Sequence, residues 1–238
     1  MTATNIKVKI LGIVGTPIKN GNCQFQLEAA LRQAEDTGQA TTELVHLRDY
    51  KFSFCIGCDK CMRNIHKLQA KVGYDVSPVP IEGYNCSIKD DMEILHRKMT
   101  EADGIILMAP VYIASIPGQV KTFIDRCRTF VHDFRLQDKV ATAMTVGFFR
   151  NAGQDTALDL MRTSLSALGL NIVSFGAAAV STRDGLGVPI RETRFGVQED
   201  FAGSVMMSIA VKRLVRMAVL VKAGKLALEE EESAFSNF

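Results

Sequence analysis

The chain has 238 residues, of which 47% are hydrophobic, and this is enough for one large domain with a sizeable core. Its 28 basic and 26 acidic side chains are interspersed and give a net charge of +2. The sequence therefore shows no basic cluster of the kind that binds nucleic acid or an anionic membrane. We find no secretory signal at the amino terminus and no apolar run near the roughly 18 residues of a membrane span. We therefore expect a cytoplasmic protein whose thiols stay reduced.

Short aliphatic runs alternate with amphipathic stretches of helical period, which is the pattern of a parallel sheet covered on both faces. The predicted strands are residues 7–14, 42–47, 104–109, 139–146 and 171–175. The predicted helices are residues 23–37, 90–101, 118–131 and 154–168. These elements predict an α/β fold, a flavodoxin-like doubly wound five-stranded parallel sheet with helices on both faces.

Three segments depart from this rhythm. Residues 64–84 contain glycines and prolines without a clear period, and we expect an inserted loop or lid there. Residues 181–195 form a second irregular segment, and residues 199–228 read as a long terminal helix with a broad apolar band, which suits core packing or a subunit interface. We expect a single domain over residues 1–238, with a cysteine segment and inserted loop at 55–86 and a helical extension at 199–228.

Four of the six cysteines gather in one segment, at Cys55, Cys58, Cys61 and Cys86. The first three form C-x-x-C-x-x-C, and thiols in so short a loop converge around a shared point, as they do around iron–sulfur clusters. Zinc more often takes two separated C-x-x-C pairs. Redox-active thiols, or reduced half-buried thiols without a metal, are the other interpretations.

The first predicted strand runs into a segment rich in glycine and asparagine, residues 15–23, which leads into a helix. In a doubly wound sheet this segment brings hydroxyl, amide and backbone N–H groups to a helix N-terminus, where a phosphate is stabilised. The segment matches neither G-x-G-x-x-G nor G-x-x-x-x-G-K-[ST], which disfavours a Rossmann dinucleotide site and a P-loop. A plain turn is the alternative.

Two further loops follow the third and fourth predicted strands, at residues 109–118 and 147–154. The first of them could offer backbone amides to the polar edge of a planar ring system and apolar side chains to its face. Tyr112 in this loop could equally be a half-exposed packing aromatic. The second loop would close over the same crevice.

The motifs G-T-P-x-K-N-G-N, C-I-G-C-x-x-C, I-K-D-D-M, A-D-G-I-I-L-x-A-P-V-Y and K-x-F-I-D-R occur in this order within residues 7–175. Together they resemble the NAD(P)H-dependent FMN reductase superfamily, and specifically its iron–sulfur flavoprotein branch. The resemblance implies an FMN whose phosphate lies at the first loop and whose ring lies between the second and third loops. The implied FMN-binding residues are Thr16, Lys19, Asn22 and Cys23, then Pro110, Val111, Tyr112 and Ile113, then Gly147 and Gly153.

The resemblance also implies an oxidoreductase that passes electrons between FMN and a 4Fe-4S cluster on the four gathered cysteines, with NAD(P)H as a possible donor. No side chain is needed as a catalytic acid or base. The expected partners are a redox partner or a small-molecule electron acceptor, together with further copies of the chain in a dimer or tetramer.

This sequence departs from the superfamily at two places. Cys23 stands where Thr or Ser is usual, and 24 residues separate Cys61 from Cys86, whereas the branch has only a handful there. Two other functions therefore stay open. One is a cluster-free NAD(P)H-dependent FMN, quinone or nitro/azo reductase, and the other is a non-enzymatic flavodoxin-like interaction protein.

Overall fold

A parallel sheet forms the centre of the computed structural model, which describes residues 6–72, 81, 83–191 and 193–235. The strand order is β2-β1-β3-β4-β5, and β6 pairs with β4 beyond β5. This is the flavodoxin-like doubly wound order, so the predicted fold class is confirmed. The strands are β1 (Val8–Val14), β2 (Ala40–His46), β3 (Gly104–Pro110), β4 (Val140–Gly147), β5 (Asn171–Ile172) and β6 (Ala177–Val180).

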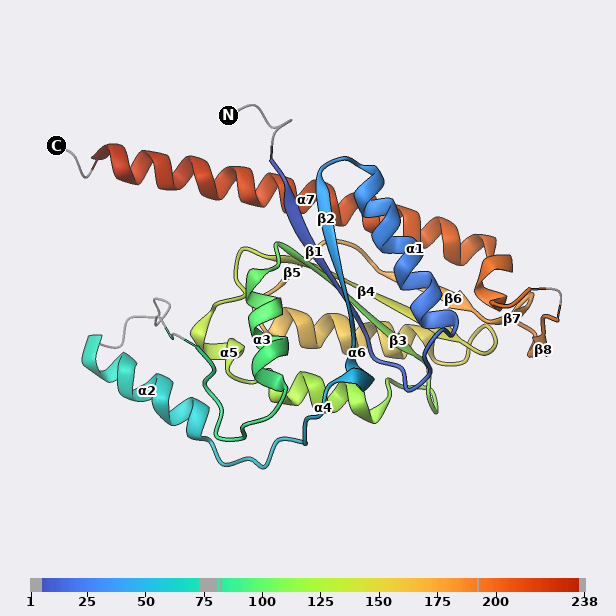
Figure 1. The fold of residues 1–238 in the computed structure, drawn as a ribbon, viewed down its shortest axis with the longest axis horizontal. Coiled ribbons are helices and arrows are strands. Elements are labelled where there is room, and N and C mark those ends of the chain that lie inside the picture. Colours follow the sequence, from blue (N-terminus) through green and yellow to red (C-terminus); the bar gives the residue numbers. More distant parts are fainter. Residues whose placement is uncertain (1–5, 73–80, 82, 192, 236–238) are drawn as a thin grey trace.

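Helices cover both faces of this sheet (Figure 1). Buried side chains of α1 and α7 pack on one face, and those of α3, α4 and α6 pack on the other. The helices of the described residues are α1 (Asn22–Asp36), α2 (Lys60–Val72), α3 (Met92–Glu101), α4 (Gly118–Arg126), α5 (Phe130–Asp133), α6 (Gln154–Ala167) and α7 (Phe201–Phe235). None of them is long and apolar enough to cross a membrane.

The central strands follow from their apolar runs. Every residue of β3 and β4 is buried, as expected of parallel strands covered on both faces. The first four predicted strands are present, each with its ends within two residues of the prediction. The carboxyl ends of β1, β3 and β4 therefore meet at one edge of the sheet, where the three predicted loops begin.

Two predicted elements are each divided in two. The strand expected at 171–175 ends at Ile172, and pairing with β4 resumes at β6. Gly176 separates them at φ 102°, and a Cβ there would lie 2.6 Å from Ala143 O, so the turn requires glycine. The helix expected at 118–131 is α4 and the short α5, because Cys127 and Phe130 donate to carbonyls three residues back and tighten the backbone between them.

The prediction of an irregular segment over 64–84 is wrong for its first part, because α2 occupies residues 60–72. Met62 and Ile65 lie three residues apart on one face of α2 and are buried, and this spacing is the helical signal. Residues 73–80 and residue 82 of the predicted lid lie outside the described residues.

The terminal helix is longer than predicted, and its far end extends beyond the sheet (Figure 1). Val211, Leu214 and Val215 bury one face of α7 in the core, whereas Phe201 and Ile209 stay largely exposed. Before α7, the segment predicted to be irregular, residues 181–195, contains a small antiparallel pair, β7 (Thr182–Arg183) with β8 (Val188–Pro189). A 3-10 turn, η3 (Gly196–Glu199), follows this segment.

Candidate functional site

The three predicted loops lie together at the carboxyl edge of the sheet, where β1 and β3 diverge to their own helices. A doubly wound sheet binds ligands at such a point, because the crossover helices leave the edge on opposite faces. Gly15 N–H donates to Met108 O at 2.8 Å, and Val111 N–H donates to Val146 O at 2.9 Å. The loops after β1 and β3 are therefore each joined by a backbone hydrogen bond to the neighbouring strand.

The first loop ends at the bare N-terminus of α1. Gly21 is the N-cap residue, and no side chain of the described residues caps the amides that follow it. Asn20 adopts φ 52° and donates its N–H to Gln24 Oε1 at 2.8 Å, which fixes the entry into the helix. Free amides at the positive end of a helix dipole are a site for a phosphate.

The four predicted phosphate residues differ in what their side chains do. Thr16 is 3% exposed, and its Oγ1 accepts from Ile18 N–H at 3.2 Å. Asn22 Oδ1 accepts from Val197 N–H at 3.2 Å. Lys19 Nζ lies 2.6 Å from Asp49 Oδ1.

The thiol of Cys23 packs into the core under α1 rather than into the first loop. Burial raises its pKa to about 12, so it stays a neutral thiol at physiological pH. What Cys23 can offer at the first loop is its backbone N–H, since the residue stands in the first turn of α1. A buried sulfur is thus tolerated at this position without loss of a loop donor.

The second loop is a tight, strained turn. Tyr112 and Ser115 exchange backbone hydrogen bonds of 2.8 and 3.0 Å, and the two residues between them, Ile113 and Ala114, both have positive φ, 47° and 56°. Positive φ is unfavourable for residues with a Cβ, and such strain clusters at binding sites. The turn presents the Ile113 side chain almost wholly to solvent, 98% exposed, with the Tyr112 ring half exposed beside it.

The third loop is shaped by the side chain of Gln154. Its Nε2 donates to Phe149 O and its Oε1 accepts from Ala152 N–H, each at 2.8 Å. A Cβ on Gly147 would lie 2.4 Å from that Nε2. Gly153 adopts φ 101° against the second loop. Gly153 is therefore required by backbone packing against the second loop, whereas Gly147 leaves room for the side-chain amide of Gln154.

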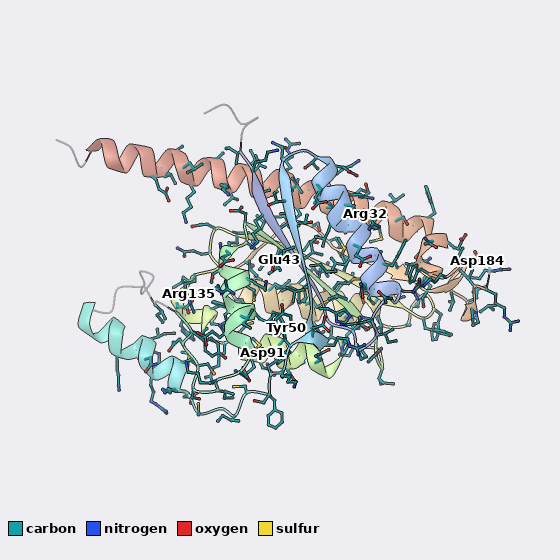
Figure 2. The ribbon with its side chains drawn as sticks, in the orientation of Figure 1. Arg32, Glu43, Tyr50, Asp91, Arg135 and Asp184 are labelled. Atoms are coloured by element: carbon teal, nitrogen blue, oxygen red, sulfur yellow. The ribbon has the colours of Figure 1, made fainter. Side chains whose placement is uncertain are left out.

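The cysteine segment lies after β2, between the 3-10 turn η2 (Leu47–Asp49) and α2. Lys51 N–H donates to Asp91 Oδ2 at 2.6 Å, so this segment meets the start of α3 where Tyr50 and Asp91 are labelled in Figure 2. Gly57 and Asp59 adopt positive φ and turn the chain within C-x-x-C-x-x-C.

The four thiols differ in exposure but share one region. Cys55 is exposed, and the other three are half-buried. Cys58 Sγ lies 3.0 Å from the Oγ of Ser87, the neighbour of Cys86, and this hydrogen bond is the main cause that lowers the pKa of Cys58. The pKa of Cys61 is raised, chiefly by burial and further by the nearby Cys86 and Cys55.

The structure therefore places the segment of Cys86 near the three-cysteine loop, through the Cys58–Ser87 contact and the influence of Cys86 on Cys61. Among the described residues, no three or more His, Cys, Asp or Glu side chains are arranged closely enough to form a ready metal site. The donor set itself, four thiols on two short segments, suits an iron–sulfur cluster. The other two cysteines, Cys23 and Cys127, are buried in the core and away from this set.

Sequence analysis missed a buried charged residue beside these thiols. Arg126, the last residue of α4, pairs with Asp90 through two hydrogen bonds of 2.7 and 2.9 Å. Its Nη2 also donates to Tyr84 Oη at 2.6 Å and to Cys86 Sγ at 3.8 Å. The available signal was an arginine directly before Cys127 in the otherwise apolar stripe of a helix, together with the acidic pair that follows Cys86.

One helix connects the two candidate sites. α4 begins at Gly118, directly after the second loop, and ends at Arg126 beside the thiols. Its nine residues span about 13 Å, because an α-helix rises 1.5 Å per residue. In Figure 1 the cysteine segment runs below α4 toward α2. The second loop and the cysteine segment thus lie toward opposite ends of one short helix.

Comparisons with known proteins agree with this geometry. A family model for NADPH-dependent FMN reductase matches residues 8–184. An iron–sulfur flavoprotein of Archaeoglobus fulgidus is 33% identical over 211 residues, which is 87% of this chain and 96% of that protein. An iron–sulfur flavoprotein of Methanocaldococcus jannaschii is 36% identical over 151 residues, 63% of this chain and 68% of that protein.

A solved structure extends the similarity of fold. RosB, with the bound intermediate 8-demethyl-8-formylriboflavin-5'-phosphate, has a TM-score of 0.66 and covers 94% of this chain and 87% of its own. At 16% identity this match supports the fold alone. The family match spans β1 to β7 and includes all three loops at the carboxyl edge. The chain therefore belongs to the NADPH-dependent FMN reductase family, in its iron–sulfur flavoprotein branch, and is a flavin-dependent oxidoreductase.

Proposed function

We propose that this chain passes electrons between FMN, bound at the three loops, and a 4Fe-4S cluster bound by Cys55, Cys58, Cys61 and Cys86. The observation that carries the proposal is the return of Cys86 to the C-x-x-C-x-x-C loop despite the 24 residues between Cys61 and Cys86. FMN supplies the conversion between two-electron and one-electron transfer when bound, and the protein sets its position and environment.

The first loop would bind the phosphate of FMN. The backbone amides of Asn22 and Cys23 at the start of α1, the side-chain NH₂ of Asn22 and the hydroxyl of Thr16 are the donors in reach. Lys19 would supply positive charge, shared with Asp49. These groups are neutral donors apart from Lys19.

The second and third loops would bind the ring system. Backbone groups of Pro110 and Val111 leave β3 at the edge of the sheet, and Tyr112 and Ile113 present apolar surface at the turn. Gly147 and Gly153 would allow the third loop to approach from the other side. A donor such as NAD(P)H would approach the exposed side of this crevice, where Ile113 is uncovered.

The cysteine segment would supply four thiolates to the cluster. An exposed Cys55 beside half-buried thiols would allow iron and sulfide to enter, and the turns at Gly57 and Asp59 would let the motif fold around one centre. The Ser87 hydroxyl already favours the ionised form of Cys58. Cys58 would thus lose its proton more readily than Cys61, whose pKa is raised chiefly by burial.

Anaerobic purification, followed by analysis of flavin, iron and acid-labile sulfide, tests the proposal. We expect FMN and one 4Fe-4S cluster per chain, with flavin absorption bands above a broad cluster absorption. A protein that keeps FMN but takes up neither iron nor sulfide on anaerobic reconstitution is the cluster-free reductase. A protein that binds no flavin either is an interaction protein, and the proposal is then wrong in both parts.

A further inference from the structure

The side chain of Arg126 is 1% exposed although it carries a full charge. Burial opposes that charge, but the bonds to Asp90 and the contact with Tyr84 outweigh it and raise the pKa of Arg126. Such a buried ion pair rarely contributes much to stability by itself, because desolvation offsets the attraction. The role of Arg126 therefore depends on the other groups that its guanidinium contacts.

The guanidinium connects two segments that are far apart in sequence. Its Nη1 donates to Ser53 O at 2.8 Å, two residues before Cys55. Its Nη2 donates to Cys86 Sγ at 3.8 Å and to Ile88 O at 3.5 Å. The first contact holds the C-x-x-C-x-x-C loop, and the others hold the segment that brings the fourth cysteine.

Asp90 completes the same connection from the other side. Its Oδ2 accepts from Ser53 N–H and its Oδ1 accepts from Met92 N–H, each at 3.2 Å. The Arg126–Asp90 pair thus holds both the N–H and the C=O of Ser53. A planar guanidinium with a fork of donors is required for this arrangement, and a lysine ammonium cannot reproduce it.

One of these contacts has a chemical consequence. An N–H that donates to a thiolate stabilises negative charge on the sulfur, and hydrogen bonds to ligand sulfurs are among the factors that set the potential of an iron–sulfur centre. Arg126 Nη2 is a charged donor aimed at Cys86 Sγ from a site that water barely reaches. The same contact in bulk water would be weaker.

We propose that Arg126 is a positioning residue of the cysteine site, which fixes the Cys55 and Cys86 segments against each other and, through its N–H donated to the Cys86 sulfur, raises the reduction potential of the centre bound there. The second part rests on the proposed function, since it needs the cluster. The first part concerns the chain alone and applies with or without iron.

The test compares Arg126→Lys and Arg126→Gln with the wild type. The matched control is Arg135→Lys, because Arg135 forms a similar pair with Asp133 at 2.8 Å and donates to Gly83 O, close to the same segment, but no contact with a cysteine is described for it. Arg135 lies in the region above α2 in Figure 2. The lysine variants preserve the charge, so a loss of folding is least expected from them.

Hydrogen exchange of the cluster-free chain measures the first part. We expect exchange of the Ser53 amide and of residues 84–90 to rise roughly tenfold or more in both Arg126 variants, because hydrogen bonds to a charged group are lost. The control should leave the Ser53 amide unchanged. Unchanged exchange at Ser53 in the Arg126 variants overturns the positioning role, whether or not the wild type holds iron.

Redox titration of the reconstituted protein measures the second part. We expect a lower potential in Arg126→Gln, by about 59 mV if the one-electron equilibrium shifts tenfold. If Arg126→Gln has the wild-type reduction potential but altered hydrogen exchange, Arg126 only positions the two segments, and this second part is wrong. A wild type that takes up no iron and sulfide overturns the proposed function and this part together, while the exchange result still decides the first part.

Discussion

Gly153 faces Ala114 so closely that a Cβ on Gly153 would lie 2.5 Å from the Ala114 Cα. Both residues have positive φ, and they belong to different loops, the third and the second. The two loops that would enclose the flavin ring are therefore built against each other, and neither can move without the other. This contact is a sensitive point for the shape of the crevice.

Replacement of Gly153 by Ala should weaken flavin binding at least tenfold. The added methyl group meets Ala114 backbone and must also adopt φ 101°, which together cost on the order of 1–3 kcal/mol. Flavin fluorescence titration measures the affinity. Gly118→Ala is the matched control, because no described atom lies within 4 Å of a Cβ built at Gly118 and the position begins α4. Equal affinity in both variants would contradict the ring-loop assignment.

The phosphate assignment predicts a strong effect of Asn22→Asp. Aspartate retains an oxygen that accepts from Val197 N–H, so the local packing is preserved, but it places a negative charge beside the phosphate. We expect extracted flavin to be largely lost, with Lys19→Ala giving a smaller loss because Lys19 is exposed and already paired with Asp49. Flavin content per chain after gel filtration measures both, and wild-type content in Asn22→Asp would remove the first loop from the site.

The six cysteines should fall into two groups. Cys→Ser changes at Cys55, Cys58, Cys61 and Cys86 should each abolish or destabilise the cluster after anaerobic reconstitution. Cys→Ala changes at the buried Cys23 and Cys127 should leave iron and sulfide content unchanged while lowering the melting temperature, since each removes packed core atoms. A Cys86→Ser variant with wild-type iron and sulfide would show that the fourth ligand lies elsewhere.

The sequence and the structure agree where local pattern decides the conformation. The apolar runs of β3 and β4 predict buried parallel strands, because only a sheet covered on both faces accommodates them. α2 was missed, since the glycines and prolines after residue 72 obscure the spacing of Met62 and Ile65. The hydrophobic spacing therefore predicts an element well only where no cluster of glycine and proline lies next to it.

Long-range contacts in the site could not be read from the chain. Arg126 and Ser53 lie 73 residues apart, and their hydrogen bond depends on how α4 packs under the segment after β2. The same holds for Gly153 and Ala114, because a sequence records the glycine but not the backbone that faces it. The resemblance predicts which residues bind the cofactors, whereas the contacts between these segments are visible only in the structure.

The exposed apolar side chains of α7 predict self-association. Phe201 is 81% exposed, Ile209 62% and Leu220 52%. These three positions lie toward one side of α7, and exposed apolar side chains gathered in this way are typical of an interface. We expect a dimer or tetramer by light scattering at micromolar concentration. Ile209→Glu should shift the protein toward the monomer, with unchanged flavin content as a control for folding. A monomeric wild type under these conditions would contradict the predicted self-association.

The buried His96 predicts a loss of stability in acid. Its Nε2 donates to Arg126 O at 3.1 Å, and burial lowers its pKa to about 3 from the usual 6.5. The unfolded chain therefore binds a proton below pH 6.5 that the folded chain excludes down to about pH 3, so stability is full above pH 6.5 and falls as the pH drops through this window. The loss approaches about 1.4 kcal/mol per pH unit for a single group.

His46 and His132 are also shifted downward by burial and contribute in the same direction, so a variant must isolate His96. His96→Gln keeps an amide N–H that can donate to Arg126 O but does not titrate. Urea unfolding at pH 7.5 and pH 5 measures the difference. We expect the wild type to lose more free energy of unfolding between these two pH values than the variant, by roughly 1–2 kcal/mol. If both proteins lose the same amount, His96 is protonated in the folded state and its neutral contact with the end of α4 is wrong.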